Sequence, residues 1–296
     1  MADYILNMGG VNNSAYSSVV DVFQVTNSSV AKRNDLNLAL ITAHSSLAAA
    51  ACGDYILAMG GANSSAYSSV VDVFQVTSSG VEAVTGHGLT LSQARGGLVA
   101  ASAGDYILAM GGQAGSSSYS SVVDVFHVTA SGVEALTDHG LSLSQARANL
   151  VAAACGEYIL AMGGYTVVGG GYGSVLDTVD VFHVTSSGVE KITDHGLSLS
   201  TPCYGLAAAS AGDYILAMGG TTGPDSPGQV HNTVDVFHVT ASGIEKITDH
   251  GLTLSTARYS LSAASAGGYI LAMGGWTSTT SSTDITNTVD VFQILN

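Results

Sequence analysis

Cationic side chains recur at one position of this sequence, eleven residues before the tyrosine of a repeated motif. Arginine occupies this position in three repeats, and histidine and cysteine occupy it in one repeat each: Arg95, Arg147, Arg258, His44 and Cys203. A guanidinium group can hold a carboxylate through two parallel hydrogen bonds. We therefore expect the three arginines and His44 to contribute to a ligand site. The alternative is that each arginine packs between neighbouring repeats or pairs with a local Asp or Glu.

The loops that follow each Gly-Gly pair vary in length and composition, whereas the other turns are nearly uniform. The last three of these loops, residues 165–178, 221–233 and 276–288, are the longer ones. They contain aromatic and imidazole side chains that could stack on a ligand or hydrogen-bond to it. These residues are Tyr165, Tyr172, His231 and Trp276. Diversity on one side of a uniform scaffold favours a binding role. The alternative is that the sequences of these loops vary because no binding role constrains them.

The sequence contains no constellation typical of catalysis or of a metal site. The recurrent Asp-His pairs lie just beyond a predicted strand, where a turn role is expected. Three other histidines are replaced by glutamine in the remaining repeats, a change that keeps a polar side chain but loses a metal ligand: His127, His183 and His238. We therefore identify no catalytic residue, metal or cofactor, and the sequence favours a protein without enzymatic activity while leaving an enzyme open as an alternative.

The charge balance excludes two classes of partner. The net charge is −15, with only seven Lys and Arg residues. Nucleic acids and anionic membrane surfaces both require clustered basic side chains. The first residues enter the first repeat at once, without a charged leader or a long apolar run. We therefore expect neither nucleic-acid binding nor membrane insertion, and a cytoplasmic or virion-associated location.

The chain is built from a repeat with a period of roughly 50 residues. Five copies read Tyr-Ile-Leu-Ala-Met-Gly-Gly, and the first copy has Asn7 in place of Ala. The copies begin at Tyr4, Tyr55, Tyr106, Tyr158, Tyr214 and Tyr269. Within one repeat, short apolar runs at 98–103, 106–110, 122–129 and 133–137 alternate with Gly-bearing turns. This pattern predicts four β-strands per repeat, which we call A, B, C and D in chain order.

The size gradient across these strands predicts a β-propeller. Strand A contains mostly Ala and Ser, while Tyr, Phe and Val stand in the later strands. Blades that converge on an axis leave the least room for the innermost strand. The chain begins at a B strand and ends at a C strand, so the first and last blades are expected to be incomplete. We therefore expect one domain over residues 1–296, with strand Tyr4–Met8 presenting an edge open to strand addition by a partner or a second copy.

The six Gly-Gly doublets after an apolar strand resemble those of kelch repeats. The resemblance covers nearly the whole chain, although the tryptophan of the kelch pattern is missing. The resemblance implies an all-β, six-bladed kelch-type propeller, of the kind found in arrays from bacteria and phages. Kelch propellers serve as protein adaptors, sugar-binding modules, an oxidase domain and a sialic acid mutarotase, so the fold by itself does not fix the function.

Three functions remain open at this level. The leading expectation is a non-enzymatic recognition module that binds a glycan or a protein through the side carrying the B–C and D–A loops. The first alternative is a structural component, for example of a phage virion, that docks through the open edges of its terminal blades. The docking partner is then another protein or a second copy of this chain. The second alternative is an enzyme similar to the sugar mutarotase.

Overall fold

The apolar runs of the sequence form strands, and the protein is an all-β, six-bladed propeller with mostly four-stranded blades. The structure, a computed structural model, describes residues 3–295 except 13–14, 168–172, 224–227 and 282. The chain divides into two compact units, Met1–Gly140 and Leu141–Asn296, called unit 1 and unit 2. The expected single domain over residues 1–296 stays a prediction.

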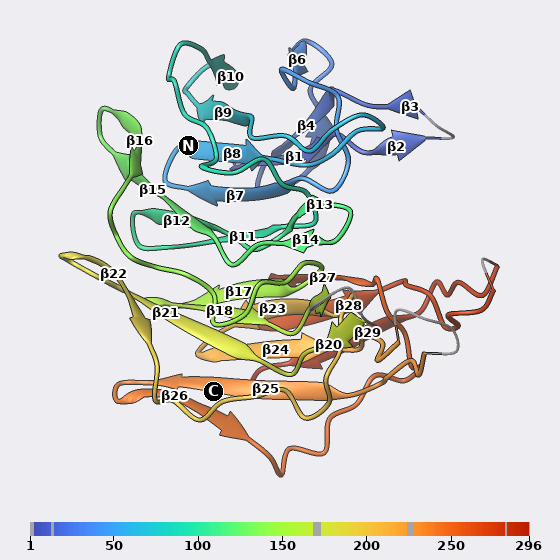
Figure 1. Ribbon diagram of the computed structural model, residues 1–296. Coiled ribbons are helices and arrows are strands. Elements are labelled where there is room, and N and C mark those ends of the chain that lie inside the picture. Colours follow the sequence, from blue (N-terminus) through green and yellow to red (C-terminus); the bar gives the residue numbers. More distant parts are fainter. Residues whose placement is uncertain (1–2, 13–14, 168–172, 224–227, 282, 296) are drawn as a thin grey trace. The chain divides into compact units, whose positions relative to one another are not determined.

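Unit 1 contains blades 1, 2 and 3, coloured blue to green in Figure 1. Blade 1 consists of β1 (Asp3–Met8), β4 (Val19–Val25), β5 (Val30–Lys32) and β6 (Leu38–Ala39). Blade 2 consists of β7 (Ala48–Cys52), β8 (Tyr55–Met59), β9 (Val71–Val76) and β10 (Val81–Val84). Blade 3 consists of β11 (Val99–Ala103), β12 (Tyr106–Met110), β15 (Val123–Thr129) and β16 (Gly132–Leu136). Two small hairpins lie in B–C loops: β2 (Val11–Asn12) with β3 (Ala15–Tyr16), and β13 (Gln113–Gly115) with β14 (Ser118–Tyr119).

Unit 2 contains blades 4, 5 and 6, coloured yellow-green to red in Figure 1. Blade 4 consists of β17 (Val151–Cys155), β18 (Tyr158–Met162), β21 (Val179–Thr185) and β22 (Gly188–Ile192). Blade 5 consists of β23 (Ala207–Ala211), β24 (Tyr214–Met218), β25 (Val234–Thr240) and β26 (Gly243–Ile247). Blade 6 consists of β27 (Ser262–Ala266), β28 (Tyr269–Met273) and β29 (Val289–Gln293). A hairpin of β19 (Tyr165–Val167) and β20 (Gly173–Val175) lies in the B–C loop of blade 4.

The terminal blades are incomplete in the part of the chain that the structure describes. Strand β1 is the end strand of its sheet and pairs with β4 alone, so no A strand lies beside it. Strand β29 is likewise an end strand that pairs with β28 alone, so blade 6 has no D strand. Both findings confirm the strand order expected from the sequence. Partner addition at β1 stays a prediction.

The blades that contain an A strand have the size gradient that the sequence predicts. In blade 3, the residues Ala101, Leu108, Val125 and Leu136 pair in one row across the four strands. The small residue stands in strand A, where strands of successive blades approach closely. The Ser102 hydroxyl, for example, donates a hydrogen bond to the Ala51 carbonyl oxygen of blade 2 at 2.6 Å. A larger side chain in strand A would therefore push neighbouring blades apart.

The core consists of contacts between the two faces of successive blades. The valine face of a blade carries the Leu and Met of strand B with two valines of strand C. The phenylalanine face carries the Ile and Ala of strand B with the Phe of strand C. In unit 1, Val71 and Val73 of blade 2 pack in one cluster with Ile107 and Phe126 of blade 3. The same pairing of faces occurs between blades 1 and 2, blades 4 and 5, and blades 5 and 6.

The Gly-Gly pair after strand B is required by the next blade. In blade 2, Gly60 and Gly61 both have positive φ angles, of 67° and 98°. A Cβ on Gly60 would lie 2.6 Å from the carbonyl oxygen of Arg95, which begins blade 3. The Gly61 N–H donates a hydrogen bond to that same oxygen at 2.9 Å. In blade 2 the doublet therefore serves backbone contact with blade 3, and a side chain at Gly60 or Gly61 would clash.

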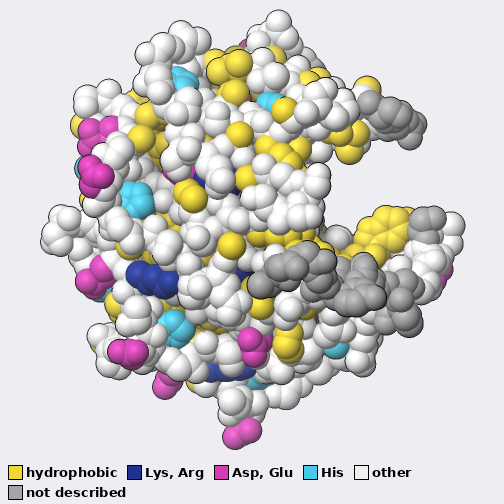
Figure 2. Space-filling model, viewed as in Figure 1, with side chains coloured by type: hydrophobic (Ala, Val, Ile, Leu, Met, Phe, Trp, Pro, Cys, Tyr) yellow, Lys and Arg dark blue, Asp and Glu magenta, His cyan; other side chains and the backbone are white. Residues whose placement is uncertain are grey.

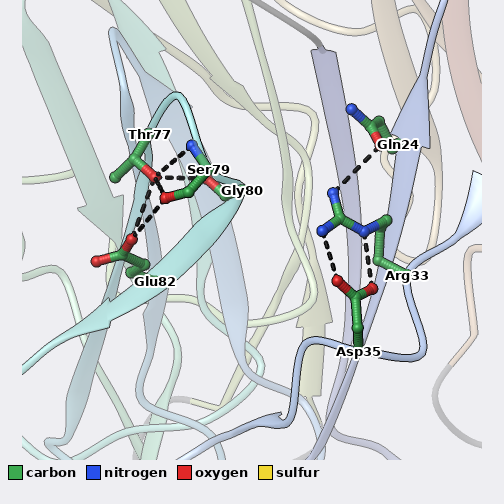
Figure 3. A network of polar contacts seen from close by, with 7 residues as sticks. All are labelled: Gln24, Arg33, Asp35, Thr77, Ser79, Gly80 and Glu82. Carbon is green, nitrogen blue, oxygen red and sulfur yellow. Dashed lines mark hydrogen bonds and ion pairs between the residues drawn. The ribbon is translucent and has the colours of Figure 1, made fainter.

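Turns on either side of strand D are held by short side-chain networks. In blade 2, the Thr77 Oγ1 lies 2.9 Å from the Ser79 Oγ and 3.2 Å from Glu82 (Figure 3). The second network of Figure 3 lies in blade 1, where Arg33 donates to both carboxylate oxygens of Asp35 at 2.8 and 2.6 Å. This contact lowers the pKa of Asp35 to about 2. Both networks shape turns on the surface.

The surface is poor in charge. Figure 2 shows mostly uncharged polar side chains and backbone, with few basic side chains on the face in view. Among the described residues, no helix has the length and apolar character needed to cross a membrane.

Candidate binding site on the loop face of unit 2

The B–C and D–A loops of one blade meet through a short backbone bridge. In blade 6, Tyr259 and Trp276 exchange two backbone hydrogen bonds of 3.0 and 2.9 Å. Tyr259 directly follows the recurrent cationic position, and Trp276 directly follows the Gly-Gly pair. Antiparallel residues that exchange both hydrogen bonds present their side chains on the same side. The bridge therefore brings two variable positions together on the loop face, which is the side of each unit that carries these loops.

The same bridge occurs in blades 2 to 5 with different side chains. In unit 1 the paired residues are small or polar: Ser45 with Ala62, and Gly96 with Gln113. In unit 2 each pair includes at least one aromatic residue: Ala148 with Tyr165, Tyr204 with Thr221, and Tyr259 with Trp276. The backbone is thus shared, while the side chains of unit 2 provide apolar rings.

The aromatic residues of these bridges follow one another across unit 2. We call Tyr165, Tyr204, Tyr259 and Trp276 the aromatic row. The ring centroids of Tyr165 and Tyr204 lie 5.9 Å apart with the planes tilted by 47°. A Cβ on Gly205, next to Tyr204, would lie 3.5 Å from the Tyr259 ring. Since Tyr259 is bridged to Trp276, the row extends over three successive blades.

The aromatic row is held in place by its surroundings. The Tyr204 hydroxyl donates a hydrogen bond to the Gly223 carbonyl oxygen at 3.0 Å. The D–A loops are also tied to one another, because the Gly205 N–H donates to Asn149 at 3.3 Å and the Ser260 N–H donates to Gly205 at 2.6 Å. All four residues of the row are partly exposed. Fixed and partly exposed rings offer apolar surface at low entropic cost.

The three arginines lie inside the blades. Arg95, Arg147 and Arg258 each have 0% exposure. Each guanidinium group forms an ion pair with the Asp of strand C in its own blade: Arg95 with Asp124 at 2.7 Å, Arg147 with Asp180 at 2.8 Å, and Arg258 with Asp290 at 2.6 Å. Each also donates to a strand B carbonyl oxygen, at 2.9 to 3.0 Å. The structure therefore shows each arginine paired with a local aspartate, which was the alternative raised in the sequence analysis. A ligand role for these arginines stays a prediction, and it requires the Arg–Asp ion pair to open.

The electrostatics of these pairs support a scaffold role. Burial lowers the pKa of Arg147, and the charge of Asp180 opposes that shift. Burial also acts to raise the pKa of Asp180, but the charges of Arg147 and Lys191 outweigh it, so the pKa lies below its ordinary value. Lys191 contacts Asp180 at 2.7 Å. The carboxylate is therefore already satisfied by two cations.

Histidine and cysteine occupy the arginine position in blades 2 and 5. Both His44 and Cys203 are buried. Burial lowers the pKa of His44, against the charge of Asp72. Burial, with the charge of Asp235, raises the pKa of Cys203 to about 12. A neutral thiol of this kind is a poor nucleophile and a poor metal ligand.

The remaining predicted site residues lie in the long loops. Tyr165 and Trp276 belong to the aromatic row, whereas Tyr172 lies outside the described residues. The His231 backbone donates to Gly220 and accepts a hydrogen bond from the Arg258 N–H, at 2.9 and 3.0 Å. Burial lowers the pKa of the His231 ring. The backbone of His231 therefore holds the B–C loop of blade 5 in place through these two hydrogen bonds.

Sequence reasoning missed Tyr204, Tyr259 and the strand C aspartates. The two tyrosines directly follow the recurrent cationic position, which was the signal that could have identified them. The aspartates stand between valines in the repeated Val-Asp-Val-Phe segment. A carboxylate in an otherwise apolar strand indicates a buried cationic partner.

No protein-family model matches this sequence, and the search of curated proteins finds no similar protein. Among the described residues, no three His, Cys, Asp or Glu side chains gather in a group that could hold a metal ion. The candidate binding site is the aromatic row, because the fold brings its four residues next to one another on the loop face.

Proposed function

We propose that this chain is a non-enzymatic recognition module that binds a neutral glycan through the aromatic row of unit 2. The observation that carries this proposal is the alignment of Tyr165, Tyr204, Tyr259 and Trp276 over three successive blades. Stacked C–H faces of sugar rings suit a series of partly exposed aromatic rings, since each ring offers a flat apolar surface. An extended site of this kind fits an oligosaccharide better than a single small sugar.

The composition of the surrounding loops favours a neutral ligand. Residues 165–178, 221–233 and 276–288 contain no Lys or Arg, and they are rich in Ser, Thr and Gly, with amide groups at Gln229, Asn232 and Asn287. Hydroxyl and amide groups can exchange hydrogen bonds with sugar hydroxyls. An anionic glycan lacks a cationic partner here, because the arginines nearby are buried and paired with aspartates.

The repeat pattern is compatible with this role. The Gly-Gly doublets resemble those of kelch repeats, and we propose that the blades are of kelch type. Kelch propellers include sugar-binding modules as well as protein adaptors, so the alternative occupant of the loop face is a protein. The enzymatic alternative has no observation in its favour among the described residues.

Binding to a panel of neutral oligosaccharides, measured by glycan array and then by calorimetry, tests the proposal. Trp276→Ala and Tyr259→Ala should each weaken binding by about tenfold, which corresponds to ~1.4 kcal/mol. The matched control is Gln113→Ala, which removes the residue at the Trp276 position from blade 3 of unit 1 and should leave affinity unchanged. Urea unfolding of each variant checks that the fold is intact.

Two outcomes would contradict the proposal. The first is a lack of binding across the whole neutral panel. The second is glycan binding that Trp276→Ala and Tyr259→Ala leave unchanged, since that would move the site away from the aromatic row. Specific capture of a protein that competes at the aromatic row would support the protein alternative instead.

A further inference from the structure

A cavity of about 200 Å³ lies beside strands β9 and β10 of blade 2, and all of the residues that line it belong to unit 1. Asp72 lines it from β9 and is only 9% exposed. The rest of the wall is mostly apolar and includes Ala39, Ile41, Phe74 and Ala83. A buried carboxylate in such surroundings requires a partner of opposite charge.

The strand C aspartate has a cationic partner in each of the other five blades. The partner is the arginine that begins the blade or a lysine of strand D, and blade 4 has both. The pairs are Lys32 with Asp21, Arg95 with Asp124, Arg147 and Lys191 with Asp180, Lys246 with Asp235, and Arg258 with Asp290. Of the six aspartates, Asp72 is the one that forms no ion pair with any residue in the described part of the chain.

Neither histidine near Asp72 supplies the missing charge at neutral pH. His44 occupies the arginine position, and burial lowers its pKa. His87 lines the cavity, and its Nδ1 accepts a hydrogen bond from the Leu89 N–H at 3.0 Å. A ring nitrogen that accepts a hydrogen bond carries no proton, so this imidazole is neutral. Asp72 accepts a hydrogen bond from the Ile41 N–H at 2.7 Å, which leaves its charge uncompensated.

Blade 4 shows which group fits beside the aspartate. The Lys191 Nζ lies 2.7 Å from Asp180 and donates to the Ser142 carbonyl oxygen at 2.9 Å. Lys246 makes the same two contacts in blade 5, at 2.7 and 2.8 Å. Both lysines pair with the phenylalanine of strand C, and Ala83 holds this position in blade 2. The space that a lysine side chain fills in blades 4 and 5 is therefore bounded in blade 2 by a methyl group.

Blade 2 retains both acceptors that the lysine uses. The Ile41 N–H donates to Asp72 as the Ser144 N–H donates to the aspartate of blade 4. The carbonyl oxygen that accepts from Lys191 belongs to the residue two positions before Ser144, and its counterpart in blade 2 is Ala39, which lines the cavity. Ile41 is 71% exposed, so the mouth of the cavity is open and apolar where blade 4 has a serine.

We propose that this cavity binds a primary alkylammonium group, with the Asp72 carboxylate and the Ala39 carbonyl oxygen as acceptors. The ammonium takes the place that a lysine holds in blades 4 and 5, and the alkyl chain lies against Ile41 and Val84. Free alkylamines and lysine side chains both carry this group. The net charge of −15 attracts cations to the protein. The site uses residues of unit 1 alone, so the inference is independent of glycan binding by unit 2.

Titration with n-butylammonium chloride, followed by NMR on methyl-labelled protein, tests the proposal. The methyl signals of Ile41, Ala83 and Val84 should shift and reach saturation, because these residues line the cavity. The probe n-butanol has the same chain without the charge, and potassium chloride controls for ionic strength. Neither should produce saturable shifts. Nα-acetyl-lysine N-methylamide is the second ammonium probe; if it binds as well, the site also accepts lysine side chains, and otherwise it takes free amines.

Two substitutions of acidic residues separate the site from general attraction of cations. Asp72→Asn should weaken n-butylammonium binding by at least about tenfold, because the amide lacks the charge that strengthens the hydrogen bond. Glu82→Gln is the matched control. Glu82 is an exposed acidic residue beside Ala83 in β10 and lies outside the cavity wall, so its loss should leave binding unchanged.

Ala83→Lys places an ammonium group of the chain itself in the cavity. This variant should no longer bind n-butylammonium, and its midpoint of urea unfolding should lie above that of the wild-type protein. The gain should disappear when Ala83→Lys is combined with Asp72→Asn, because the carboxylate is then missing. The unfolding measurement therefore reports on the site even where amine binding is weak.

Four results would overturn the proposal. Absence of saturable shifts with n-butylammonium would exclude the site, and equal binding of n-butanol would make it an apolar cavity. An equal loss of affinity in Asp72→Asn and Glu82→Gln would reduce the effect to general electrostatic attraction. Amine binding that persists in Ala83→Lys would place the amine elsewhere on the protein.

Discussion

Blade 2 in unit 1 and blade 4 in unit 2 have the same strand order but differ at the positions beside the Gly-Gly pair. In blade 4, Arg147 forms a buried ion pair with Asp180. In blade 2, the arginine position is occupied by His44, and the equivalent carboxylate is Asp72. Burial raises the pKa of Asp72, against the Ile41 N–H and the charges of two histidines. The pKa of Asp180 is lowered instead. One position of the repeat thus has two electrostatic environments.

The loop faces of the same two blades also differ. The bridge of blade 4 carries Tyr165, whereas that of blade 2 joins Ser45 to Ala62. The strands beneath these bridges have the same register, for Leu57 pairs with Val73 in blade 2 as Leu160 pairs with Val181 in blade 4. The scaffold is therefore independent of the side chains on the loop face. This independence is why we assign recognition to those side chains and stability to the pairs below them.

The largest difference is expected from removing the aspartate charge in each blade. Asp180→Asn leaves Arg147 and Lys191 without their carboxylate, and it should cost about 3–5 kcal/mol of unfolding free energy at neutral pH. Asp72→Asn keeps an oxygen that can accept the Ile41 N–H, which donates to Asp72 at 2.7 Å. Because the Asp72 pKa is raised by burial, this second change should cost no more than about 1 kcal/mol. Urea unfolding of both variants measures the difference, and equal losses would contradict it.

A smaller difference is expected in pH dependence. The folded-state pKa of His44 lies below its ordinary value of 6.5. As the pH falls below about 6.5, the unfolded chain binds a proton that the folded chain excludes, so stability decreases. Arg147 keeps its charge throughout this range. His44→Gln should therefore remove up to about 1 kcal/mol of the stability lost between neutral pH and pH 5.

Asp72 contributes to the pH profile with the opposite sign. Its folded-state pKa is raised, so its contribution is present at low pH and is lost as the pH rises through that value. Asp72 is retained in His44→Gln, so the wild-type protein is the proper reference at each pH. Unfolding free energies of the two proteins over this range give the measurement. Parallel profiles would show that His44 is not the group responsible.

The scaffold could be predicted from the sequence, but most of the candidate site could not. Residues such as Tyr106 and Gly111 recur with a constant spacing, and that spacing fixes strand B and its end. The site depends on which residue of a D–A loop faces which residue of a B–C loop. That register follows from backbone bridges between segments 17 residues apart, such as Tyr259 and Trp276, and no local pattern indicates it. Tyr259 was missed for this reason, whereas Trp276 was found because its residue type is rare.

The smallest difference concerns backbone strain in the D–A loops. Ser46 of blade 2 and Asn149 of blade 4 hold equivalent positions, with φ angles of 55° and 53°. Asparagine tolerates this left-handed conformation better than serine, and glycine adopts it without strain. Ser46→Gly should therefore raise the unfolding free energy by about 0.5 kcal/mol, after the greater freedom of glycine in the unfolded chain is included.

The matching change in blade 4 should have the opposite effect. Asn149→Ala keeps a Cβ but removes the short polar side chain that makes the left-handed region accessible, so it should lower the unfolding free energy by about 0.5–1 kcal/mol. The backbone hydrogen bond from Gly205 to the Asn149 carbonyl oxygen is retained in this variant. Urea unfolding of both variants under the same conditions measures the two shifts. Shifts of the same sign would show that something other than backbone strain distinguishes the two blades at this position.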